Sequence, residues 1–142
     1  MSTQAHWPQL GVGAVVCHQK ALLLVKRARP PGQGLWAIPG GRVQPGETMQ
    51  AAAEREIREE TGVRIRAAGL AWQFEHIEQD PDGGLRFHYV VLDFYGEYLS
   101  GEPKAGDDAS EARWVPFAEL NGLALHPETA RLLRSFYPEA FA

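Results

Sequence analysis

Residues 47–61 form the segment that most restricts how this chain can fold. The segment contains no glycine or proline and is rich in alanine, glutamate and arginine, which are good helix formers. Gly62 follows directly, at the position where a residue in the left-handed conformation commonly ends a helix. Because β-rich segments lie on both sides of it, the sequence predicts an α/β domain in which this helix packs on a mixed β-sheet.

The other expected elements are short. Apolar and β-branched runs predict strands at 12–17, 21–26, 36–38, 63–77, 85–98 and 113–115, and the sequence predicts a helical turn at 116–120 and a helix at 127–137. Cys17 lies in the first apolar run and is expected to be a small core residue. The chain has 142 residues and no repeat or linker, so we expect one domain spanning residues 1–142.

Charge and composition narrow the function classes. Lys and Arg total 14 against 18 for Asp and Glu, a formal net charge of -4, which argues against a nucleic-acid backbone as partner. A nucleotide as a small-molecule substrate stays open. With one cysteine, an intrachain disulfide is impossible. No stretch approaches the ~18 apolar residues of a membrane span, and the first residues do not resemble a signal peptide. We therefore expect a cytoplasmic protein without a membrane partner.

Three glutamates of the predicted helix share one side. At about 100° per residue, Glu56, Glu59 and Glu60 fall within an arc of roughly 100°, whereas Glu54 and Arg58 fall on the far side, where solvent is expected. Like charges three and four residues apart repel on an ordinary helix. The cluster also borders an expected apolar stripe, made of Met49, Ala53 and Ile57.

The spacing alone leaves two interpretations open, a solvated acidic face and a site for a divalent cation. Oxygen ligands grouped in this way suit Mg²⁺ or Mn²⁺, which keep several waters and bridge to substrate phosphates. Gly40, Gly41 and Gly46 precede the helix and would allow the backbone to approach a ligand closely.

The spacing from residue 41 to residue 63 resembles the Nudix box at every defined position. The matching residues are Gly41, Glu47, Arg55-Glu56-Ile57, Glu59-Glu60 and Gly62-Val63. A looser similarity extends to residues 34–40 and 111–120. The resemblance implies the Nudix fold, an α/β/α sandwich with a central mixed β-sheet. It also implies a hydrolase that cleaves nucleoside diphosphate derivatives with Mg²⁺ or Mn²⁺.

The same resemblance assigns roles within the box. Glu56 and Glu60 would be the principal metal ligands, and Glu59 either a further ligand or the base that helps to activate the attacking water. The carbonyl group of Gly40 or Gly41 would be an additional metal ligand. Structural roles are implied for Glu47, Arg55 and Gly62, with the first two forming an ion pair that fixes the loop to the helix.

Outside the box each assignment has an alternative. Glu111 matches a position where many family members have a further catalytic glutamate, but it could also be a solvated acid beside Asp107 and Asp108. Arg27 and Arg42 could bind phosphate oxygens or lie on the surface. Strand aromatics could stack on a base, although most strand aromatics are core residues; the candidates are Phe74, Tyr89 and Trp72.

The box predicts the reaction and leaves the substrate open. We expect ADP-ribose or a nucleotide sugar; the alternative is a nucleoside triphosphate, including modified or oxidised ones. The proline that often marks ADP-ribose enzymes is absent, because its position falls on Glu78 or Gln79, and this weakens the case for ADP-ribose. The tyrosine that marks diadenosine-polyphosphate enzymes is also missing. Two other classes are a non-catalytic nucleotide-binding domain and an isoprenoid diphosphate isomerase, which would need a catalytic cysteine. The sequence is compatible with a homodimer.

Overall fold

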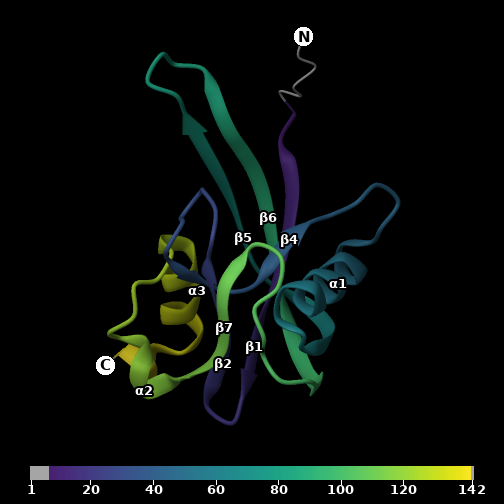
Figure 1. The fold of residues 1–142 in the computed structure, drawn as a ribbon, viewed down its shortest axis with the longest axis vertical. Helices are drawn as coiled ribbons and strands as arrows, with labels where there is room; N and C mark the ends of the chain where they lie inside the picture. Colours follow the sequence, from purple (N-terminus) through teal and green to yellow (C-terminus); the bar gives the residue numbers. More distant parts are fainter. Residues whose placement is uncertain (1–6, 142) are drawn as a thin grey trace.

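The computed structural model describes residues 7–141, which form a seven-stranded sheet with helices packed around it (Figure 1). The central strand order is β3-β2-β1-β6-β5, with β4 paired to β1 and β7 paired to β2. The elements are β1 (Gln9–His18), β2 (Ala21–Arg27), β3 (Trp36–Ala37), β4 (Gly40–Arg42), α1 (Met49–Thr61), β5 (Arg64–Gln79), β6 (Leu85–Ser100), β7 (Ala109–Pro116), α2 (Phe117–Leu120), α3 (Pro127–Phe136) and the 3₁₀ helix η1 (Pro138–Phe141).

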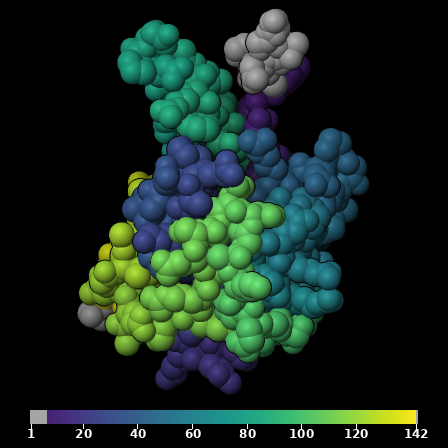
Figure 2. Space-filling view, viewed as in Figure 1, coloured from purple at the N-terminus to yellow at the C-terminus, as the bar shows by residue number. Residues whose placement is uncertain are grey.

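The sheet is mixed, as predicted. Strand β1 runs parallel to β6 and antiparallel to β2 and β4, whereas β5 and β6 form a long antiparallel hairpin. The outer end of the hairpin, around the turn between β5 and β6, stands clear of the body in the space-filling view (Figure 2), whereas its inner half belongs to the central sheet. Within residues 7–141, no helix has the length and apolar character needed to cross a bilayer.

Helices α1 and α3 cover opposite faces of the sheet (Figure 1). Successive side chains of a strand point to opposite faces, so one strand can contribute to the core beneath each helix. In β2, Leu23 belongs to the core cluster that contains Ile57 of α1, whereas Leu22 and Leu24 belong to the cluster that contains Leu132 of α3. All five of these side chains are fully buried. Burial of each stabilises the fold by about 1.5–3 kcal/mol before entropy is counted. The predicted α/β/α layering is confirmed.

Helix α1 is defined by a cap at each end. The Oγ1 atom of Thr48 accepts a hydrogen bond from the Ala51 N–H at 3.1 Å, which satisfies one unpaired donor of the first turn. Gly62 has φ 78°, and its N–H donates to the Arg58 carbonyl at 2.8 Å. The helix begins two residues later than predicted because Glu47 belongs to the preceding turn, where its N–H donates to the Gln44 carbonyl.

Three expectations about individual side chains were wrong. Cys17 is exposed, because β1 is buried only up to Val16 and then reaches the β1–β2 turn. Met49 is 40% exposed, and it is the first residue of α1. Glu54 is not simply solvated, because its Oε2 atom accepts a hydrogen bond from the Ala67 N–H at 2.8 Å, where β5 has an irregular register.

Candidate active site

A cavity of about 890 Å³ lies between the sheet, helix α1 and the loops around residues 27–31, 107–108 and 126–129. Its floor is formed by side chains of β5 and β6 that point to the same face of the sheet: Phe74, His76, Tyr89, Val91 and Asp93. One wall carries Glu56, Glu59 and Glu60 of α1 together with the loop from Pro39 to Pro45. The opposite wall contains Arg27, Arg29 and the start of α3.

The loop before α1 is held close to the helix by its two consecutive glycines. A Cβ atom on Gly41 would lie 2.2 Å from the Glu56 carboxyl carbon, and one on Gly40 would lie 2.1 Å from the Val12 carbonyl oxygen. Both glycines belong to β4, which pairs with β1 through Gly13 and Val12. The sequence did not predict β4, because two glycines give no strand signal. The missing side chains allow the loop backbone to approach the carboxylates.

Glu60 is a buried carboxyl group at the inner end of this loop. Its side chain accepts a hydrogen bond from the Gly40 N–H at 3.0 Å, and the residue is only 8% exposed. Burial is the main reason why its pKa is raised to about 7; the Gly40 hydrogen bond and the charge of Arg27 act in the other direction. Glu60 is therefore a buried acid without an ion-pair partner among residues 7–141.

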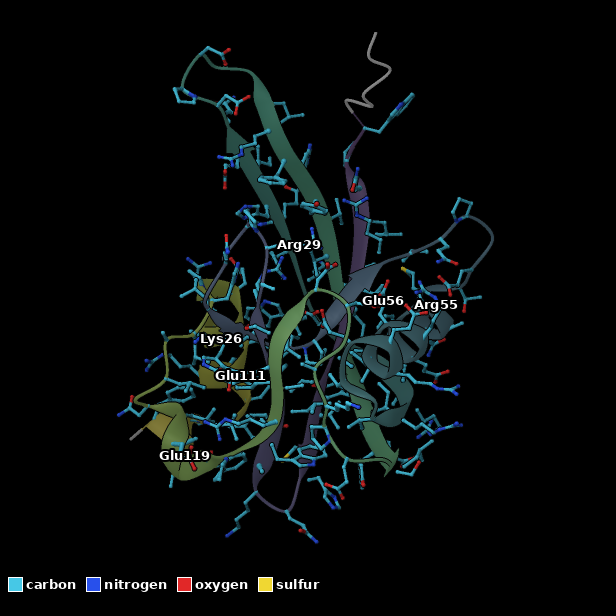
Figure 3. All side chains as sticks on the ribbon, viewed as in Figure 1. Lys26, Arg29, Arg55, Glu56, Glu111 and Glu119 are labelled. Carbon is cyan, nitrogen blue, oxygen red and sulfur yellow. The ribbon has the colours of Figure 1, made fainter. Side chains whose placement is uncertain are left out.

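Arg55 connects the other acids of the helix and loop. Its guanidinium group binds both carboxylate oxygens of Glu47, at 2.6 and 2.9 Å, and donates to Glu56 and Glu59 at 3.1 Å each. It also donates to the Arg42 carbonyl at 2.9 Å. The hydrogen bonds from Arg55 lower the pKa of Glu47 to about 2. Arg55 thus fixes the loop and orients two of the three clustered glutamates (Figure 3).

The donor set of Glu56, Glu59 and Glu60 with the adjacent loop carbonyl groups is chemically suited to Mg²⁺ or Mn²⁺, since all the donors are oxygens. Among the described residues, no three acidic, histidine or cysteine side chains are arranged as a ready-made metal site. Two of the carboxylates are engaged by Arg55, and the third is turned towards the Gly40 N–H. The buried Glu60 carboxyl, which has no ion-pair partner in the described part of the chain, is the observation that best fits a metal ligand.

Glu111 lies apart from these glutamates. It is on β7 and faces Lys26, with a distance of 3.9 Å between the charged atoms, and Figure 3 shows this pair separated from Glu56 and Arg55. Glu111 does not line the cavity, whereas the neighbouring acids Asp107 and Asp108 do. Asp107 and Asp108 lie in the segment before β7, which touches the loop at residues 27–35 (Figure 2). The Ala28 N–H donates a hydrogen bond to the Asp108 carbonyl there.

The other candidate ligand-binding residues line the cavity. Arg27 donates to the Pro31 carbonyl at 2.6 Å, and Arg42 lies 3.4 Å from the Tyr89 hydroxyl group. Phe74 is on the floor. Trp72 is not part of the lining and instead directs its Nε1–H towards Glu128.

Sequence reasoning missed several residues of the cavity. They are Asp93, Asp107, Asp108, His76, His126 and Glu128. One signal was present for Asp93, because a single acid interrupts the apolar run of β6. No comparable pattern marks His126 or Glu128, which line the cavity because α3 packs on the sheet.

Comparison with known proteins gives a consistent result. A family model described as the NUDIX domain matches residues 7–139. An ADP-ribose pyrophosphatase from Methanocaldococcus jannaschii is 36% identical over 85% of this chain and 69% of its own length. The nucleoside triphosphatase NudI from an Enterobacter species is 32% identical over 81% of this chain and 86% of its own. The crystal structure of a MutT NUDIX hydrolase from Burkholderia pseudomallei has a TM-score of 0.77 at 30% identity, covering 91% of this chain and 98% of that one.

Proposed function

The chain belongs to the NUDIX family of hydrolases that act on phosphorus anhydrides, and from this premise we propose that it cleaves the diphosphate linkage of a nucleoside diphosphate derivative, with ADP-ribose or a nucleotide sugar as substrate. The size of the cavity carries the proposal. At about 890 Å³, it lies near the upper end of the ~300–1,000 Å³ typical of ligand sites, which favours a substrate with two moieties joined by a diphosphate. The relative named ADP-ribose pyrophosphatase supports the same substrate.

The clustered acids of α1 are the proposed metal-binding groups. Glu56 and Glu60 would hold Mg²⁺ or Mn²⁺ together with a carbonyl group of Gly40 or Gly41. When bound, the ion would lower the pKa of water and neutralise charge that develops on the phosphoryl oxygens. These carboxylates border the same cavity as the proposed substrate groups, as positioning in phosphoryl transfer requires.

Glu59 is the proposed base, with ligation as its alternative role. Its side chain is 46% exposed, compared with 19% for Glu56, so it is the more accessible of the two to a water molecule from the cavity. Arg55 donates a hydrogen bond to Glu59 at 3.1 Å and would keep its carboxylate oriented. Removal of Arg55 should therefore disturb the base and the ligand Glu56 together.

Two arginines and two aromatic side chains are the proposed substrate-binding groups. Arg27 and Arg42 lie on opposite sides of the cavity and could each donate to phosphate oxygens. Phe74 and Tyr89 lie on the floor between them, where a ring could stack on a base or pack against a sugar. A catalytic role for Glu111 is implied by the family resemblance alone, and its contact with Lys26 outside the cavity argues against that role.

A nucleoside triphosphate is the second candidate substrate. The relative named nucleoside triphosphatase, at 32% identity, favours it. The same acids and arginines would serve, since both reactions break a phosphoanhydride bond. The two candidates differ in products: ADP-ribose gives AMP and ribose 5-phosphate, whereas a triphosphate gives a monophosphate and pyrophosphate.

A hydrolysis panel tests the proposal. Purified protein with Mg²⁺ or Mn²⁺ is incubated with ADP-ribose, nucleotide sugars, dinucleoside polyphosphates and nucleoside triphosphates, and the products are separated by chromatography. We expect the highest kcat/KM for a nucleoside diphosphate derivative. A higher value for a triphosphate would replace the first candidate by the second. Binding of a nucleotide without turnover of any substrate would indicate a non-catalytic domain.

A further inference from the structure

His126 is a cavity residue that has no part in the proposed chemistry. It directly precedes α3, on the wall that also contains Arg27 and faces the clustered glutamates. Its backbone is fixed on both sides, because its N–H donates to the Trp36 carbonyl at 2.7 Å and its carbonyl accepts from the Ala130 N–H at 2.9 Å. The imidazole ring therefore starts from a fixed point at the edge of the cavity.

One ring nitrogen of His126 is used by the helix. The Nδ1 atom accepts a hydrogen bond from the Glu128 N–H at 3.2 Å, so His126 is the N-cap of α3. A ring nitrogen that accepts a hydrogen bond carries no proton, and the neutral ring therefore has its proton on Nε2. Burial and, to a smaller degree, the charges of Arg27 and His76 lower the pKa of His126, which favours the neutral form. The Nε2 atom is thus a hydrogen-bond donor.

Gly32 restricts which edge of the ring faces the cavity. It has φ 80°, and a Cβ atom there would lie 2.8 Å from the His126 Cδ2 atom and 3.3 Å from the Arg27 Cδ atom. Nδ1 is turned to α3, and Cδ2 is covered by the loop at residues 27–35. The edge that remains to line the cavity is therefore the one formed by Cε1 and Nε2. The contact with Gly32 also places Arg27 beside the ring.

The Nε2–H group of His126 has no acceptor within residues 7–141, where the only hydrogen bond of the ring is the one at Nδ1. Two neighbouring side chains are engaged or oriented otherwise. The Glu128 carboxylate is paired with Arg131 and accepts from the Trp72 Nε1–H. The centroid of the His76 ring lies 6.5 Å from that of His126, and the Nε2 atom of His76 is itself buried without a hydrogen-bond partner. A donor left free in a ligand cavity is explained if the ligand provides the acceptor.

Arg27 indicates which ligand group provides that acceptor. Its Nε–H donates to the Pro31 carbonyl at 2.6 Å, which fixes the guanidinium group and leaves its terminal nitrogens for a ligand. Burial raises the pKa of Glu60 and lowers that of His126, whereas the charge of Arg27 acts to lower both, so Arg27 lies within reach of both walls. A diphosphate that extends from the glutamates across the cavity would pass Arg27 and then His126. A guanidinium group with a neutral N–H donor beside it suits phosphate oxygens, which accept several hydrogen bonds.

We propose that His126 is a substrate-binding residue whose Nε2–H group donates a hydrogen bond to a phosphate group of the substrate, beside Arg27. The inference rests on the proposed function, because it assigns a contact to the diphosphate of that substrate. The two ring nitrogens then have separate tasks, since Nδ1 caps α3 and Nε2 binds phosphate.

Two substitutions separate these tasks. Serine keeps an acceptor for the Glu128 N–H but is too short to replace the Nε2–H group, so His126→Ser retains the cap and loses the donor. Glutamine places an amide N–H near the position of Nε2 and loses the cap acceptor, so His126→Gln does the reverse. His18→Ser is the control, because His18 packs against Tyr98 and Trp114 outside the cavity.

Calorimetric titration tests the inference without turnover. The probe is α,β-methylene-ADP with Mg²⁺, which contains no phosphoanhydride bond, and adenosine is the matched probe without phosphate. We expect His126→Ser to bind α,β-methylene-ADP about tenfold or more weakly than wild type, the effect of losing a hydrogen bond to a charged group, and to bind adenosine unchanged. His126→Gln and His18→Ser should bind both probes as wild type does.

Melting temperatures should give the opposite order, which a purely structural role would not produce. His126→Ser should melt close to wild type, and His126→Gln should melt at a lower temperature. Wild-type affinity of folded His126→Ser for α,β-methylene-ADP, an equal loss of affinity for adenosine, or a loss in His126→Gln as large as in His126→Ser would overturn the inference. Absence of α,β-methylene-ADP binding by wild type would also overturn it. If the expected binding pattern is found but no substrate is hydrolysed, only the proposed function fails.

Discussion

Gly41→Ala tests whether the approach of the loop to Glu56 matters for catalysis. The new methyl group would lie 2.2 Å from the Glu56 carboxyl carbon and 2.3 and 2.5 Å from its two oxygens, so the carboxylate must move. Its hydrogen bond to Arg55 at 3.1 Å would then be lost. Hydrogen bonds to charged groups contribute about 1.5–3 kcal/mol, and partial exposure of both groups reduces this to about 1–2 kcal/mol.

The variant should fold and lose activity. Urea unfolding should show a loss of about 1–2 kcal/mol, because the displaced group is the flexible end of a side chain. The value of kcat should fall by about 10²-fold, since a displacement of about 1 Å at a catalytic group has effects of that size. Gly122→Ala is the control, because nothing lies within 4 Å of a Cβ atom there. A folded Gly41→Ala protein with wild-type kcat would refute the proposed position of Glu56 in the reaction.

Three further predictions concern acidic residues of the site and its surroundings. Glu60→Gln should lower kcat by ~10²-fold or more, because a negative charge that would hold the metal ion is lost. Glu54→Gln should leave kcat nearly unchanged, because glutamine can still accept the hydrogen bond from the Ala67 N–H. Equal losses of kcat in the two variants would contradict the assignment of Glu60 and Glu54 to different sides of the helix. Because the pKa of Asp93 is raised from 3.8 to about 7 on folding, the metal-free protein should lose stability as pH rises between these values. The melting temperature of Asp93→Asn should fall less than that of wild type over this pH range. Parallel plots of melting temperature against pH for the two proteins would refute this prediction. Since Glu111 contacts Lys26 outside the cavity, Glu111→Gln should change kcat as little as Glu119→Gln, which alters an exposed acid of α2 that is paired with Arg113. A much larger loss would return Glu111 to the reaction.

The long helix and the strands could be predicted because their signals are local. Helix α1 has good helix formers along its whole length and a glycine that ends it. Residues 21–25 of β2 are an apolar run, and Leu22, Leu23 and Leu24 are buried on alternating faces. The start of β7 was missed because Ala109 and Ser110 follow a polar, acidic loop and resemble it in composition.

The acidic face of α1 could be predicted from helical periodicity, but its partners could not. A rotation of about 100° per residue places Glu56, Glu59 and Glu60 on one side of the helix, and it allows Arg55 to reach Glu59. It does not show that Arg55 also binds Glu56 or that Glu60 turns to the Gly40 N–H, because both contacts depend on how the loop packs. Asp93 belongs to the cavity only through the pairing of β6 with β1, which joins residues 80 positions apart.

Metal-dependent hydrolysis of ADP-ribose by wild type and Glu60→Gln tests whether the buried glutamate of α1 holds a metal ion that the reaction needs. Products are followed by chromatography with Mg²⁺, with Mn²⁺ and with a chelator, and circular dichroism verifies that both proteins are folded. We expect AMP and ribose 5-phosphate from wild type with either ion, no turnover with the chelator, and at least ~10²-fold less product from Glu60→Gln. Equal turnover by folded wild type and Glu60→Gln, or turnover that persists in the chelator, would show that Glu60 does not hold a metal ion that hydrolysis requires.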